Sequence, residues 1–293
     1  MLVILCVLLG VAYLTLLERK ILSYMQLRKG PNKVGIMGLV QPLGDAVKLF
    51  LKQLIIPLWG NKWPFMISAL LGLSIGLALW GVMPSFYQVN FKSVSFMIFI
   101  CISSLNVYIT MGAGWASNSM YSFLGALRAS AQTISYEVCL VLILFFPLFI
   151  NQSFSLESFL EAYPFLILMP LLGASWFVTS LAETNRAPFD FAEGESELVS
   201  GFNVEYGGGL FALLFLGEYT VIFFLSLFGT LLFLGPSFSF FLVLGAFMLC
   251  FLFLFIRGIY PRQRYDLLMN ICWKNLLPFS MGVLSLSCLL FYI

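Results

Sequence analysis

The sequence predicts an all-α membrane protein that crosses a bilayer about eight times and carries a short amphipathic helix on one face. Hydrophobic residues make up 61% of its 293 positions, charged residues only 10%, and the mean hydropathy is +1.01. Apolar runs of nearly membrane length follow one another along the whole chain. Such runs are expected to be helices, because a helix satisfies its own backbone hydrogen bonds in lipid. We treat residues 1–293 as a single integral membrane domain.

The first expected span, residues 1 to 17, has neither a basic start nor a small-residue cleavage site. It is therefore interpreted as a helix rather than a signal peptide. At about 1.5 Å per residue this helix barely crosses a hydrocarbon core of about 30 Å, which places Glu18 and Arg19 at the lipid boundary. Further spans are expected at residues 64–83, 94–113, 129–150, 164–182, 210–232, 239–256 and 276–293.

Positive charge is confined to alternate loops. The loops 18–63, 114–128, 183–209 and 257–275 carry 14 of the 15 Lys and Arg residues, and the opposite loops carry only Lys92. This asymmetry predicts that the four loops share the inside face of an energised membrane. With eight spans, both termini lie on one side.

The first inside loop contains a turn signal, Gly30-Pro31-Asn32, followed by a second helical pattern. Apolar residues recur at helical spacing after Pro42, and the charged residues fall on another face: Leu43, Val47, Phe50, Leu51 and Leu54 against Asp45, Lys48 and Lys52. This pattern predicts a short amphipathic helix in the membrane interface. It is either a surface anchor or one wall of a cavity at the level of the lipid headgroups.

Two features of the composition exclude whole classes of site. The chain has no histidine, so it lacks the commonest metal ligand, an imidazole ligand for haem or copper, and the side chain that most readily changes charge near neutral pH. The six cysteines are scattered and contain no C-x-x-C pair. We interpret them as small buried residues and predict no metal site in this chain.

Acidic residues are concentrated between two apolar runs. The segment from Glu183 to Tyr206 holds six of the chain's 13 acidic residues against one base, Arg186. Glu137 and Glu218 are expected about eight residues into the fourth and sixth spans, at similar depths of roughly 12 Å. Carboxylates inside spans commonly face water or the bundle interior and mark ion or proton paths. The alternatives are carboxylates held by neighbouring polar groups for packing, and a solvated loop that binds partner subunits.

Five segments resemble a known family: ERKILSYMQLRKGPNKVG from Glu18, QPLGDAVKLFLKQ from Gln41, GWASNSMYSFLGALRASAQTISYEVCL from Gly114, ETNRAPFDFAEGESELVSGFNVEY from Glu183 and YPRQRYDLLMNICWKNLLP from Tyr260. They resemble the chain 1 family of mitochondrial NADH:ubiquinone oxidoreductase (complex I). The resemblance extends over nearly the whole chain, in order and with matching topology.

The resemblance implies a core subunit at the junction of the membrane and peripheral arms, which forms much of the ubiquinone access tunnel. The family's tunnel residues correspond to Arg19, Asp45, Ala46, Lys48 and Arg257. Ubiquinone or a related quinone is the implied substrate, whereas NADH, FMN and the iron–sulfur clusters belong to partner subunits. The isolated chain is expected to bind none of these cofactors, to carry no catalytic residue and to have no activity of its own.

The resemblance also implies a chain of glutamates that couples quinone reduction to proton translocation. In this sequence it corresponds to Glu137, Glu193, Glu195, Glu197, Glu205 and Glu218. We expect multi-pass insertion in the mitochondrial inner membrane, with other subunits, quinone and membrane lipids as partners and no nucleic acid. A bacterial plasma membrane is the minor alternative.

Other functions are compatible with parts of the pattern. A free-standing proton or cation transporter would also carry acids in spans, but usually shows broken helices in repeated halves, and no clear internal repeat is present here. A membrane-bound hydrogenase subunit would share the glutamates without a quinone. A structural anchor would need neither the tunnel nor the glutamates.

Overall fold

The computed structural model describes residues 2–84, 93–160, 162–191, 194, 201–235 and 239–292, and these residues contain helices and loops but no strand. The predicted all-α polytopic class is confirmed. The helical elements are α1 (Leu2–Met25), η1 (Ile36–Gly38), α2 (Gln41–Leu51), α3 (Lys62–Trp80), α4 (Ser95–Ser104), α5 (Asn106–Ser117), α6 (Met120–Asn151), η2 (Glu157–Leu160), α7 (Phe165–Leu168), α8 (Pro170–Glu183), η3 (Gly201–Asn203), α10 (Gly208–Gly229), η4 (Thr230–Leu234), α11 (Ser239–Ile259), α12 (Tyr265–Asn270), η5 (Ile271–Leu276) and α13 (Leu277–Tyr292).

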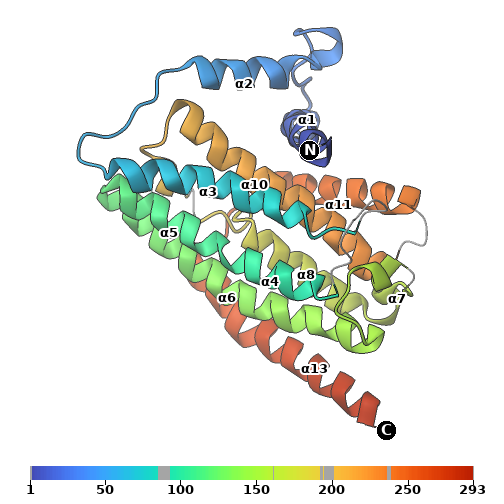
Figure 1. The fold of residues 1–293 in the computed structure, drawn as a ribbon. Helices are drawn as coiled ribbons and strands as arrows, with labels where there is room; N and C mark the ends of the chain where they lie inside the picture. The colour runs from blue at the N-terminus through green and yellow to red at the C-terminus, as the bar shows by residue number, and fades with distance from the viewer. Residues whose placement is uncertain are drawn as a thin grey trace.

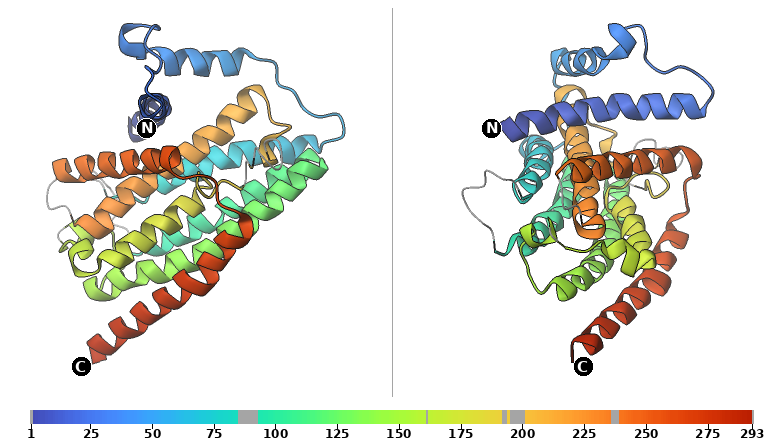
Figure 2. Two further views of the ribbon diagram at one scale, coloured as in Figure 1. Left: turned by 180° about the vertical axis from the view of Figure 1, so that it is seen from behind. Right: turned by 90° about the vertical axis from the view of Figure 1, so that its right-hand side faces the viewer.

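Most of the long helices lie side by side in one bundle. Figure 1 shows α3, α5, α6 and α10 running across the page, with α13 along one edge and α2 standing above α10 on the other side. Helix α1 is seen end-on in Figure 1 and lengthwise in the right-hand view of Figure 2, so it crosses the bundle steeply. The crossing brings α1 against α10, α11 and α2.

Six helical segments of the described chain are long and apolar enough to cross a membrane: Lys62–Trp80, Ser95–Ser117, Met120–Asn151, Gly208–Leu234, Phe240–Ile259 and Tyr265–Leu289. They cover six of the eight expected spans, with different ends. Two segments begin well before the expected residue: α6 at Met120 rather than at 129, and the last segment at Tyr265 rather than at 276. Glu137 therefore lies 17 residues after the start of its helix, and the equal spacing expected for Glu137 and Glu218 is wrong.

The other two expected spans differ more. Helix α1 does not end at Leu17 but continues to Met25. Glu18 is consequently buried within the fold rather than lying at a helix end. The expected span 164–182 is divided at Met169, because Pro170 starts a new helix there and has no N–H with which to continue the preceding one.

Glycines let the central helices approach closely. A Cβ on Gly217 of α10 would lie 2.8 Å from the backbone carbonyl of Gly72 in α3, and a Cβ on Gly76 would lie 2.1 Å from the Thr220 hydroxyl. Small residues are typical of helix contacts in membranes, where packing replaces the hydrophobic driving force. These contacts hold α10 against α3 and fix the position of Glu218, the residue after Gly217.

Aromatic side chains fill the opposite half of the bundle. Phe99 of α4 stacks on Phe228 of α10 with the ring centroids 4.3 Å apart, and Phe224 lies 5.7 Å from Phe228. All three rings are buried. Among the described residues the buried charged side chains, Glu18, Glu183, Arg186 and Asp190, lie outside this cluster, and Glu218 lies nearer the start of α10.

The predicted amphipathic helix is present as α2, with Pro42 in its first turn. Leu43, Val47 and Leu51 are exposed on its outer side, where a membrane interface would cover them. Asp45 instead turns toward α1, where Arg19 contacts it. Helix α2 therefore combines both features proposed from the sequence: an apolar outer side and a polar group facing the protein.

Candidate functional site

A cavity of about 310 Å³ lies between α1, α2 and α10. Its wall is mostly apolar, and its polar side chains are those of Thr15, Glu18, Arg19, Asp45 and Tyr219. The complete lining is Ala12, Thr15, Glu18, Arg19, Pro42, Asp45, Ala46, Leu49, Phe50, Phe211, Ala212, Phe215, Leu216 and Tyr219. We call this space the α2 cavity. Its size and composition suit a small molecule with an apolar body and one polar end.

An ion pair closes one side of the α2 cavity. Arg19 Nη1 donates to Asp45 Oδ2 at 2.6 Å, and the amide of Gln41 donates to Asp45 Oδ1 at 3.0 Å. Asp45 is thus oriented by its own helix and by α1. Arg19 remains half exposed, so the pair contributes little to global stability. Its structural effect is to hold α2 against α1 beside the cavity.

Glu18 is the buried acid of the cavity wall. It accepts hydrogen bonds from Arg257 of α11 and from the Tyr219 hydroxyl of α10, the latter at 2.5 Å. Both donors are needed, because a carboxylate removed from water is costly unless its oxygens are paired. Three helices far apart in sequence therefore meet at this carboxylate.

Arg186 contacts Tyr219 but does not line the α2 cavity. Its guanidinium carbon is 4.4 Å from the centre of the Tyr219 ring, an arrangement typical of a cation–π contact. The same guanidinium donates to Glu218 Oε2 at 3.2 Å. Arg186 is therefore a buried cation placed between the Glu18–Tyr219 contact and a second acid.

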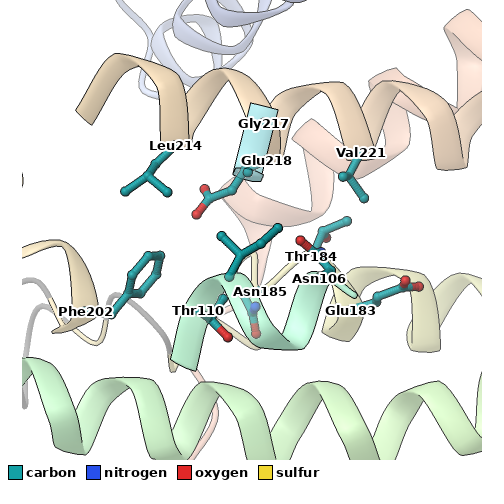
Figure 3. A pocket seen from close by; sticks show the side chains of 12 residues that line it. Asn106, Thr110, Glu183, Thr184, Asn185, Phe202, Leu214, Gly217, Glu218 and Val221 are labelled. Atoms are coloured by element: carbon teal, nitrogen blue, oxygen red, sulfur yellow. The ribbon is translucent and has the colours of Figure 1, made fainter. Parts of the chain in front are cut away.

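Glu218 faces a second, smaller cavity of about 30 Å³, which we call the acid pocket. Figure 3 shows its side chain pointing from α10 into this pocket, which Glu183 and Asn185 also line. The remaining lining residues are Gly72, Asn106, Ile109, Thr110, Thr184, Phe202, Leu214, Gly217 and Val221. The volume is sufficient for one or two water molecules, and the polar groups can hold them.

Glu183 begins the acidic segment of the sequence and is the last residue of α8 in the structure. It is buried, and its Oε2 has no hydrogen-bond partner among the described residues. Burial, together with the nearby carboxylate of Glu137, raises the pKa of Glu183 to about 8. Glu183 therefore holds a proton at neutral pH and can release it when its surroundings become more polar or more positive.

The start of the acidic loop is fixed by α6 and by the loop after α11. The Gln132 amide of α6 donates to the carbonyl groups of Ala182 and Phe189 at 2.9 and 2.8 Å. Arg262 pairs with Asp190 at 3.5 Å, and the Gln263 N–H donates to the Pro188 carbonyl. These contacts hold the 182–190 segment beside Glu218.

The expected tunnel residues mostly lie at the α2 cavity. Arg19, Asp45 and Ala46 line it, and Arg257 is one contact away through Glu18. Lys48 is exposed on α2 and lies outside the lining, so its assignment stays a prediction.

The expected proton-path residues are more dispersed. Glu218 lines the acid pocket, Glu137 is half-buried on α6, and Glu205 is half-buried after η3 and does not line the pocket. Glu193, Glu195 and Glu197 lie outside the described residues. The residues missed by sequence reasoning are Glu18, Glu183, Arg186 and Tyr219. All four occur in, or close to, the motifs that were recognised, but no periodicity or spacing indicates that they meet.

Comparison with known proteins shows the family. A sequence model described as NADH dehydrogenase matches residues 1–288. The chain belongs to the NADH dehydrogenase family. NADH-ubiquinone oxidoreductase chain 1 of Lampetra fluviatilis is 48% identical over 298 aligned residues, which cover 98% of this chain and 93% of the relative. Proteins of the same name from Aedes aegypti and Heterololigo bleekeri are 50% and 48% identical and cover 97% and 98% of this chain.

The similarity inferred from the five sequence segments is thereby confirmed, as is the expectation of a membrane-embedded subunit of a respiratory oxidoreductase. In this member of the NADH dehydrogenase family, the described residues contain no group of three acidic or cysteine side chains that could hold a metal ion. What the site offers instead is an apolar cavity with a charged end and, behind it, a buried series of acids.

Proposed function

We propose that this chain is the core membrane subunit of complex I that gives ubiquinone, or a related quinone, access to its reduction site. The observation that carries this proposal is the α2 cavity, which lies at the level of an interfacial helix and places polar groups at one end of an apolar wall. Leu49, Phe50 and Phe211 would contact the isoprenoid tail. Electrons would come from NADH through FMN and iron–sulfur clusters in partner subunits.

The charged end of the α2 cavity suits a quinone headgroup. The headgroup carries two carbonyl oxygens that accept hydrogen bonds, and Arg19 and Tyr219 are donors in the lining. Tyr219 now donates to Glu18, so a headgroup that competed for this hydroxyl would leave Glu18 with Arg257 alone. Arrival of substrate would thus alter the balance of charge around Arg257.

The same network would transmit that change to the acid pocket. Arg186 cannot itself pass a proton, because its guanidinium stays charged at any physiological pH. It can, however, respond electrostatically, since it contacts the Tyr219 ring on one side and Glu218 on the other. We infer that a charge change at Glu18 shifts protons among Glu218, Glu183 and Glu137, and from there along Glu193, Glu195, Glu197 and Glu205 to the proton-translocating subunits.

The proposed location is the mitochondrial inner membrane, with the basic and acidic loops on the matrix side. Loop contacts support one common side. The Asn61 N–H donates to the Ala116 carbonyl, and the Gln263 N–H donates to the Pro188 carbonyl. These bonds join the first loop to the second and the third to the fourth.

Photolabelling with a short-chain quinone analogue on the intact membrane complex tests the tunnel. Competable labels should fall on peptides containing α2 or the first turns of α10. Replacing Ala46, which lines the cavity, by Phe should reduce labelling and raise KM for quinone. Leu43→Phe, a matched change on the outer side of α2, should leave both unchanged. If this chain stayed unlabelled while a partner was labelled strongly, it would be an anchoring or proton-path subunit without a tunnel.

A Glu-to-Gln series tests the proton path separately. Glu137→Gln and Glu197→Gln each remove a titrating group at little steric cost, so coupled turnover should fall in both. Glu157→Gln serves as the control, since Glu157 lies in η2 and lines neither cavity. Full coupled activity in both test variants would exclude the relay while leaving the tunnel unaffected.

A further inference from the structure

Two cysteines from distant parts of the chain meet inside the protein. The Sγ atoms of Cys139 in α6 and Cys272 in η5 are 3.4 Å apart, and both residues are fully buried. The Cys272 thiol also donates to the Ser135 carbonyl at 3.3 Å, which aims it at α6. The pair is not part of either cavity and takes no part in the function proposed above.

The surroundings of the pair hold the two thiols in place. The Tyr136 hydroxyl of α6 donates to the Leu268 carbonyl at 3.0 Å, one turn before Cys272. Cys272 itself lies in a π-helical segment, Ile271–Leu276. Such wide turns are rare and often occur at functional positions. They also leave room for a small local adjustment, since tightening the turn moves the side chains that it carries.

We propose that Cys139 and Cys272 form a reversible intramolecular disulfide when the membrane complex meets a small neutral peroxide. A disulfide needs its sulfur atoms about 2.05 Å apart, so they must approach by roughly 1.4 Å. Rotation of the two side chains and tightening of the π-helical turn supply this movement. Larger separations would require the helices themselves to shift.

The chemistry proceeds in two balanced steps. One thiol attacks hydrogen peroxide, the O–O bond breaks, and a sulfenic acid and one water are formed. The second thiol then attacks the sulfenic sulfur, the S–S bond forms, and a second water leaves. In sum, two thiols lose two electrons and two protons to one peroxide. The second step is favoured because the partner thiol is already in contact, which gives it a high effective concentration.

The location of the bond determines its effect. It would tie α6 to η5 covalently, and α6 also holds the start of the acidic loop through Gln132. The other described cysteines lack this arrangement: Cys6 and Cys101 are exposed, Cys288 is half-buried, and Cys250 donates to the Ser226 hydroxyl at 3.0 Å. The expectation that the cysteines are buried is therefore wrong for Cys6 and Cys101. Oxidation would therefore restrain one specific helix contact beside the loop.

Peptide mapping of the native complex tests this proposal without any substitution. Membranes are treated with hydrogen peroxide until half of their total protein thiol is consumed, and are then denatured in N-ethylmaleimide, which traps every remaining thiol. After trypsin, the short peptide Tyr265–Lys274 should appear linked to the peptide that contains Cys139, and dithiothreitol should separate them. Cys250, which is also buried but hydrogen-bonded to a serine, is the internal control and should be recovered alkylated.

Recovery of Tyr265–Lys274 with Cys272 alkylated at that dose of peroxide would overturn the proposal. A link from Cys272 to another cysteine, or a link equally frequent for Cys250, would overturn it as well. The dose of peroxide is defined by the loss of thiols from all the membrane proteins and not from this chain alone. An unlinked Cys272 at that dose would therefore show that the disulfide does not form, because the peroxide has demonstrably reacted with other thiols.

Discussion

Gly217 offers a direct test of how tightly the acid pocket is built. Replacing it by Ala adds one methyl group at the contact between α10 and α3. The new Cβ would lie 2.8 Å from the C and O atoms of Gly72 and 3.2 Å from the N atom of Leu73. These are backbone atoms, so no side chain can turn away, and the helices themselves must separate.

The magnitude follows from the distances. Ordinary contact begins at 3.4 Å, so α10 must move by about 0.6 Å at this point. Overpacking of this kind costs about 1–3 kcal/mol, partly offset by the 0.5–1 kcal/mol that Ala gains over Gly in a helix. The complex should therefore still assemble. The same displacement, however, can lengthen the 3.2 Å contact between Glu218 and Arg186 beyond hydrogen-bond distance.

The consequence should appear in function more than in assembly. A hydrogen bond between charged groups contributes about 1.5–3 kcal/mol, and 1.36 kcal/mol is a factor of ten in rate. We expect coupled NADH:quinone turnover in membranes carrying Gly217→Ala to fall about tenfold or more, with the complex intact on native gels. Gly282→Ala is the matched control, because a Cβ there meets nothing within 4 Å. Equal activity in the two variants would refute the close-contact argument.

Three further predictions concern the network behind the α2 cavity. Tyr219→Phe removes the 2.5 Å hydrogen bond to Glu18 and should raise KM for a short-chain quinone at least severalfold in steady-state assays, whereas an unchanged KM would place the headgroup elsewhere. Arg186→Gln removes the buried cation beside Glu218. The number of protons translocated per electron should therefore fall, whereas the rate of electron transfer should change less. Equal losses of proton translocation and electron transfer would contradict this prediction. The pKa of Glu183 is raised to about 8 in the folded protein. Between about pH 4.3 and 8 the folded state therefore keeps a proton on Glu183 that the unfolded state has lost. The free energy of unfolding consequently falls as the pH rises through that window. Thermal inactivation at several pH values should therefore show a smaller alkaline loss of stability for Glu183→Gln than for the unmodified protein, and identical profiles would rule out a raised pKa.

Most of the fold could be predicted because apolar length determines which segments become membrane helices. The errors occurred where that rule gives no information. Hydropathy falls after Leu17, yet α1 continues because Glu18 and Arg19 find partners on α11 and α2. The break at Met169 was readable in principle from Pro170, but the apolar residues on both sides concealed it.

The candidate site was less predictable, for a physical reason. The family resemblance identified Arg19 and Asp45, which the structure joins at 2.6 Å. It gave no reason to place Arg186 between the Tyr219 ring and Glu218. Such contacts depend on how helices cross, and the crossing is decided by glycines whose effect appears only when two backbones meet.

The ion pair between Glu18 and Arg257 also constrains how the protein is made. The two residues are separated by 239 positions. At about 5–20 residues per second, synthesis reaches Arg257 about 12–48 s after Glu18. During that interval the first helix waits in or near the membrane with a carboxylate whose basic partner does not yet exist. Glu18, in the wall of the α2 cavity, gains its basic partner only after the seventh span has been inserted, so a chain released before that point would carry an uncompensated charge in that wall. Insertion of α11 is thus the step that completes the contacts of α1. Until then the unpaired carboxylate of Glu18 is a feature by which cellular quality control can recognise an incomplete chain.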